Sequence, residues 1–146
     1  MADRIDALKT LLTRLIDSRE GYREAKDHVS SPRLKDVFES FIARRDRDAA
    51  ELRAYLVKEG HNIGDDGSLL ASAHRTFLDM KDKVSGSEDK AVLQEVIRGE
   101  KQLLKSYEEA KDAAGATAPE TLFLREQHAA LESAISQLET REDLAA

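Results

Sequence analysis

Apolar side chains recur at steps of three and four residues along most of this chain, which is the spacing of an amphipathic helix. The stretch from Ala91 to Lys111 shows this spacing most clearly, with one apolar face made of Val92, Leu93, Val96, Ile97, Leu103, Leu104 and Tyr107. Interrupted by Gly, Ser and Pro residues, the same spacing predicts helices over about 3–29, 32–59, 68–84, 88–113 and 119–141.

The breaks between these segments contain residues that favour helix ends. Ser31 is a suitable N-cap for the next helix. Pro32 suits the first position of that helix, because the backbone N–H that proline lacks is not needed there. Gly60 is a typical stop, and the clearest loop runs from Gly60 to Gly67. A last turn is expected over 115–119, with Pro119 at the start of the final helix.

Four helices of 20 or more residues and one short helix predict an all-α fold and a single domain over 1–146. If the short helix over 68–84 returns the chain along the bundle, the helices over 32–59 and 88–113 run parallel. The prediction is then a ferritin-like antiparallel four-helix bundle with an additional short connecting helix. A plain up-and-down array of five helices fits the same periodicity.

Composition narrows the classes of function. With 40% hydrophobic and 36% charged residues, the chain is expected to fold rather than remain disordered. The absence of cysteine excludes disulfides and thiol nucleophiles and agrees with a cytoplasmic location. No apolar run approaches the roughly 20 residues of a membrane span, so no membrane insertion is expected. A net charge of −6 with both signs interspersed argues against a nucleic-acid partner.

Several polar residues fall on the apolar faces of the predicted helices. Wound at about 100° per residue, Glu100 lies near the middle of its face, where a bare carboxylate would cost several kcal/mol. The other helices place further polar residues inward at nearby heights. We therefore expect a buried polar layer, in which arginines neutralise acids, made of Arg19, Arg45, Asp48, Glu100 and Gln127.

A second interpretation is a carboxylate-bridged pair of iron or manganese ions. Its candidate ligands are Glu20, Glu51, Glu100 and His128. Bundle sites of this kind use Glu-x-x-His motifs, which this chain lacks, and inward-facing arginines would repel cations. The favoured prediction is therefore no cofactor. A third interpretation is a small anion held against Arg19 and Arg45.

Short motifs carry a resemblance to a known family. In order they are Asp17-Ser18-Arg19-Glu20-Gly21-Tyr22, Arg45, Ala50-Glu51-Leu52, Leu78-Asp79-Met80-Lys81, Gly99-Glu100, Tyr107 and Gln127. From about Ile5 to Leu138 the chain resembles the bacterial, mostly proteobacterial, ferritin-like four-helix-bundle proteins of unknown function. The resemblance implies the bundle and a cytoplasmic, stress-associated protein, with no established reaction. Relatives often have a His eight residues after the Gln, where this chain has Ile135.

These observations favour a non-enzymatic protein, structural or partner-binding. We expect it to self-associate or to bind another protein through an apolar strip on the helix over 68–84 or on the one over 119–141. The alternative is a di-iron or manganese protein for iron handling or peroxide removal.

Overall fold

The computed structural model describes residues 4–61 and 89–144, and these ranges contain helices and no strands. The helices are α1 (Arg4–His28), α2 (Pro32–Lys58), α4 (Asp89–Ala114) and α5 (Thr121–Leu144). The first three match the predicted ranges within one residue at either end. The predicted helix over 68–84, residues 62–67 of the predicted loop and the motif over 78–81 lie outside the described residues.

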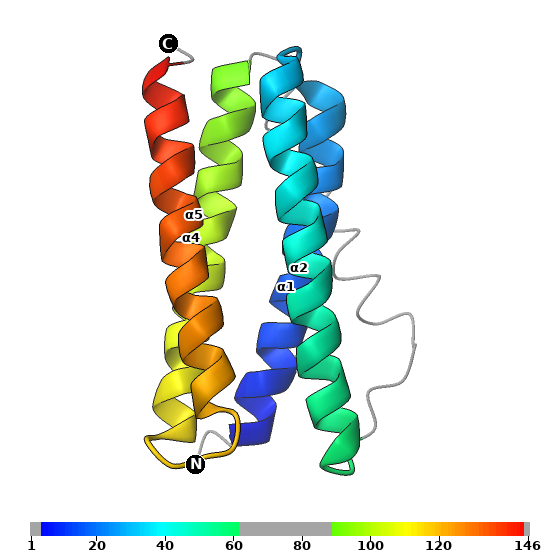
Figure 1. The fold of residues 1–146 in the computed structure, drawn as a ribbon, viewed down its shortest axis with the longest axis vertical. Coiled ribbons are helices and arrows are strands. Elements are labelled where there is room, and N and C mark those ends of the chain that lie inside the picture. The colour runs from blue at the N-terminus through cyan, green and yellow to red at the C-terminus, as the bar shows by residue number, and fades with distance from the viewer. Residues whose placement is uncertain (1–3, 62–88, 145–146) are drawn as a thin grey trace.

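The four helices pack side by side along one axis (Figure 1). α1 packs against α2 and α4, and α5 packs against α4. α2 and α4 run parallel, as expected for the helices over 32–59 and 88–113, and α1 and α5 run the opposite way. None of the helices in the described ranges has the apolar length that a bilayer crossing needs.

The start of α4 is fixed to the turn between α1 and α2. The Asp89 carboxylate accepts the backbone N–H of Ser30 (2.8 Å) and of Ser31 (3.0 Å). The Ser31 hydroxyl in turn accepts the N–H of Leu34 (3.3 Å) as the N-cap of α2, directly before Pro32. Two helix starts that are far apart in sequence are therefore joined at one end of the bundle.

Two glycines end helices as their positions predict. Gly60 after α2 and Gly115 after α4 have φ values of 84° and 73°, where a side chain would be strained. The start of the last helix differs from the prediction. Pro119 lies in a turn closed by the Thr121 N–H on the Ala118 carbonyl (3.1 Å), so α5 begins at Thr121 rather than at Pro119.

The apolar core consists of two clusters, one toward each end of the bundle. The cluster toward the α4–α5 turn includes Leu8, Leu12, Leu15, Leu52, Leu56, Leu103, Leu124 and Leu131. The cluster toward the α1–α2 turn includes Tyr22, Val29, Phe38, Val92, Leu93, Val96 and Leu138. Between them, at the middle of the bundle, lie buried polar side chains.

Candidate functional site

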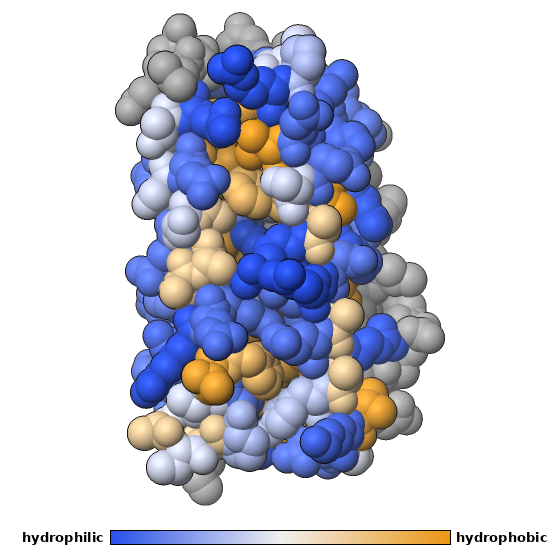
Figure 2. Space-filling view, viewed as in Figure 1, coloured by the Kyte–Doolittle hydropathy of each residue, from blue (hydrophilic) through white to orange (hydrophobic). Residues whose placement is uncertain are grey.

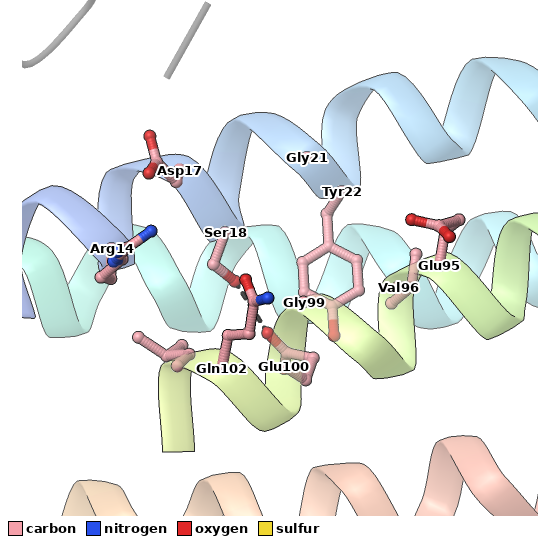
Figure 3. Close-up of a pocket in the computed structure, with 11 residues that line it drawn as sticks. Arg14, Asp17, Ser18, Gly21, Tyr22, Glu95, Val96, Gly99, Glu100 and Gln102 are labelled. Atoms are coloured by element: carbon pink, nitrogen blue, oxygen red, sulfur yellow. Dashed lines mark hydrogen bonds between the residues drawn. The ribbon is translucent and has the colours of Figure 1, made fainter. Parts of the chain in front are cut away.

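Three side chains from three helices form a closed hydrogen-bonded ring at the centre of the bundle. Arg45 from α2 and Glu100 from α4 are each 2% exposed, and Arg45 Nη2 is hydrogen-bonded to Glu100 Oε2. Ser18 from α1 donates its hydroxyl proton to Glu100 Oε1 (2.9 Å; Figure 3). The same Ser18 oxygen accepts from Arg45 Nε (3.2 Å). We call these three residues the central ring.

The charges in the central ring balance each other. Burial alone would lower the pKa of Arg45. The charge of Glu100, the hydrogen bond to it and the nearby Tyr22 and Tyr107 together outweigh burial and raise this pKa. Arg45 therefore carries its charge at every physiological pH, and a buried guanidinium needs an anionic partner. Glu100 is that partner, and Ser18 supplies one further donor and one further acceptor.

The helical spacing of α1 explains why Ser18 takes part and Arg19 does not. Leu8, Leu11, Leu15, Tyr22 and Ala25 are all buried at steps of three and four, and residue 18 continues this series. Ser18 therefore points to the bundle centre. It is a residue that we did not predict for the layer, although this spacing would have indicated it.

Arg19 lies outside the buried polar layer for which its sequence position predicted it. Its side chain is 20% exposed and pairs with Glu20 (3.0 Å) and with Asp46 (2.9 Å). One residue further along a helix is a rotation of about 100°, which carries Arg19 away from the centre and toward α2. It contributes to the surface between α1 and α2, where exposed ion pairs add little stability.

Asp48, one turn after Arg45 on α2, is 4% exposed. Its partner is Arg44, whose Nε lies 3.1 Å from Asp48 Oδ2. Burial raises the pKa of Asp48, and the neighbouring Arg44 offsets only part of this effect. Asp48 is thus a buried acid with a half-exposed partner, in contrast to Glu100.

Gln127 belongs to a second network closer to the α4–α5 turn. The Tyr107 hydroxyl donates to Gln127 Oε1 (2.6 Å), and Gln127 Nε2 donates to Glu51 Oε1 (2.6 Å). The link joins α4, α5 and α2.

Hydrophilic surface gathers at mid-height on the α2–α5 face, with more hydrophobic patches toward both ends (Figure 2).

A third network lies at the α4–α5 end and was not predicted. Glu120, just before α5, is fully buried and pairs with Arg4 (3.1 Å). It also accepts the Tyr55 hydroxyl (2.9 Å), and burial together with this hydrogen bond raises the pKa of Tyr55 to about 12. Glu120 follows Pro119 in the turn, so no helical periodicity marks it as buried.

The four candidate metal ligands do not converge. Glu20 pairs with Arg19 and Arg23, and Glu51 accepts a hydrogen bond from Gln127. Glu100 is held by Arg45 and Ser18 in the central ring. The partly buried His128 lies 3.3 Å from Glu132. Within the described ranges, no three His, Asp or Glu side chains are grouped so that they could hold a metal ion. The residues in these ranges therefore do not fit a carboxylate-bridged metal pair.

Residues 3–113 match the family described as a domain of unknown function, DUF2383. The chain belongs to this family. The matched part spans α1, α2 and α4 and contains the whole central ring, whereas Gln127 on α5 lies beyond it. No curated protein and no solved structure matches the chain.

Glu100→Gln is expected to destabilise this family member by about 3–5 kcal/mol, because it leaves the Arg45 charge buried without an anion. The free energy of unfolding from urea titrations measures the effect. Glu139→Gln is the matched control, since Glu139 pairs with Lys101 at the surface (3.3 Å) and should lose less than about 1 kcal/mol. An unchanged stability for Glu100→Gln would contradict the structural role of the ring.

Replacing Asp48 with Asn should change how stability depends on pH. The pKa of Asp48 is raised in the folded protein, so binding a proton at Asp48 stabilises the fold. This contribution to the free energy of unfolding is fully present below the ordinary pKa of Asp and is lost as pH rises through the raised pKa. The stability of Asp48→Asn relative to the wild type should therefore increase between about pH 4 and pH 7. Urea titrations across this range test it, with the exposed Asp36→Asn as control. A relative stability that falls with pH would show that Arg44 favours ionised Asp48 more strongly than burial opposes it.

Proposed function

We propose that this protein is a non-enzymatic, ferritin-like helical bundle with a structural or partner-binding role. The observation that supports the proposal is the central ring, which places a paired arginine and glutamate where a metal-binding bundle has its cations. The parallel α2 and α4 agree with a ferritin-like arrangement. The family resemblance adds a cytoplasmic, stress-associated role to the proposal.

The ring has a physical use that needs no reaction. It joins α1, α2 and α4 at one height, and a shift of α4 by one helical turn would move Glu100 by about 5.4 Å. Arg45 would then be buried without its anion, which costs far more free energy than rearranging the exposed ion pairs on the same helices. The ring thus fixes the register of three helices and gives the outer faces a defined shape.

A candidate contact surface lies at the end of the bundle where α2 ends and α5 begins. Val57 and Leu122, 57% and 70% exposed, are the exposed large apolar side chains of the described ranges. The half-buried rings of Tyr55 and Phe123 contact each other nearby, with centroids 5.5 Å apart. Hydrophobic surface is visible toward this end (Figure 2). The proposal is that a second copy of the chain or another protein covers this surface, to which α5, the last helix, contributes Leu122.

Metal analysis tests the non-enzymatic part of the proposal. Protein purified without chelator should contain iron and manganese far below one ion per chain, and adding either metal should leave its melting temperature unchanged. Glu51→Ala is the informative variant, because Glu51 is exposed and its loss should not unfold the bundle. Near-stoichiometric metal in the wild type that is lost in Glu51→Ala would overturn the proposal in favour of the metal-binding alternative.

Solution mass tests self-association. Light scattering should give a mass above the 16.3 kDa of one chain, and Leu122→Ser should lower it, because that change removes the most exposed apolar side chain in the described ranges. Glu126→Ser, at an exposed polar position on α5, is the matched control and should keep the mass of the wild type. A wild-type protein that stays monomeric over the full range of concentration would contradict self-association.

A further inference from the structure

A cleft lies between α1 and α4 at the middle of the bundle, directly over the central ring (Figure 3). Its volume is about 90 Å³, which is room for about three water molecules or a very small organic molecule. Its lining includes Ser18, Tyr22, Glu95, Val96, Gly99 and Glu100. The cleft opens to solvent on one side, so a ligand has a path to the buried carboxylate of Glu100.

Gly99 keeps this cleft open. It lies in the interior of α4, where glycine weakens a helix relative to alanine. A Cβ atom built at Gly99 would meet no atom of the described residues within 4 Å, so close packing of α1 on α4 does not require a glycine there. Because Gly99 is one of the residues that line the cleft, we expect a larger side chain at position 99 to extend into it. The glycine has no packing role in the described structure but it preserves space beside Glu100.

Tyr22 directs an unsatisfied polar group into the same space. Its side chain is 2% exposed, and its ring packs on Phe38 and Phe41 at centroid distances of 5.6 and 5.5 Å. Burial raises the pKa of Tyr22, and the charge and closeness of the Glu100 carboxylate raise it further. No group of the described residues nevertheless lies at a distance and angle that make a hydrogen bond to the Tyr22 hydroxyl. A buried hydroxyl without a partner is unfavourable, and a bound ligand would satisfy it.

The polar groups that face the cleft are mainly acceptors. Asp17, Glu95 and Glu100 line it, together with the amide of Gln102 and the exposed guanidinium of Arg14. The arginines that pair with Glu95 and Glu100 do not line it. Each Glu100 oxygen receives one hydrogen bond in the ring and has a second lone pair to offer. A ligand that brings several N–H donors suits such a lining, and Val96 and Leu103 add apolar wall.

We propose that this cleft binds a small primary amine in its ammonium form. The ammonium group lies between the Glu100 carboxylate and the Tyr22 oxygen, both of which accept its N–H groups, and a short carbon chain lies along Val96 and Leu103. This site is separate from the contact surface at Leu122, so it does not depend on the proposed self-association.

Three probes of equal size separate the possible ligands: propylammonium, propan-1-ol and propionate, each added at constant ionic strength. Amide NMR shifts of Gly21 and Gly99 report occupancy of the cleft. Propylammonium is expected to shift both resonances in a saturable way with a millimolar dissociation constant, as suits so small a ligand. No response, an equal response to all three probes, or a response to propionate alone would overturn the proposal, and the last result would favour an anion site instead.

Variants show whether the response comes from this cleft. Gly99→Ala and Gly99→Val should remain folded, the former with a raised melting temperature, and the valine should weaken propylammonium binding by at least about tenfold. Tyr22→Phe should weaken binding severalfold without lowering the melting temperature, because the lost hydroxyl has no partner in the described residues. Glu109→Ala, exposed elsewhere on α4, should bind as the wild type does. Unchanged binding in Gly99→Val would overturn the proposal.

Discussion

The buried guanidinium of Arg45 imposes the strictest condition on this bundle. An arginine cannot lose its charge in a protein interior. The folded state must therefore place an anion where it accepts hydrogen bonds from the guanidinium. Glu100 meets that condition from the opposite corner of the bundle, and Ser18 links both. Because the three residues come from three helices, their contact is possible only when α1, α2 and α4 have one relative height and rotation.

This condition also divides the interior. The two apolar clusters on either side of the central ring supply the hydrophobic stabilisation, which does not depend on direction and tolerates sliding of one helix along another. The hydrogen bonds of the ring are directional, so they do not tolerate sliding of one helix along another. Under the proposed role of the ring, stability and uniqueness have different sources in this protein. Two of the three ring residues, Ser18 and Glu100, also border a cleft open to solvent.

The place of the cleft follows from the same packing. Ser18 and Glu100 bring α1 and α4 together at the ring, while Gly99, adjacent to Glu100, leaves out the side chain that would otherwise fill the space above it. Tyr22 closes the next level with its ring, and its hydroxyl points to α4 beside Glu100. A structural device and a candidate ligand site therefore share one carboxylate, which is why the charge of Glu100 bears on both the fold and the proposed binding.

The sequence by itself determined the helices over 4–28, 32–58 and 89–114, because apolar periodicity, the Ser31-Pro32 start and the Gly60 and Gly115 stops are local signals. It also indicated that Glu100 needs a buried partner. Only the tertiary structure decided which partner, since a helical wheel gives direction about one axis and not distance to another. That is why Ser18 and not Arg19 completes the ring, why Gln127 joins Tyr107 and Glu51, and why α5 starts beyond Pro119, where a turn hydrogen bond outweighs the preference of proline for a first helical position.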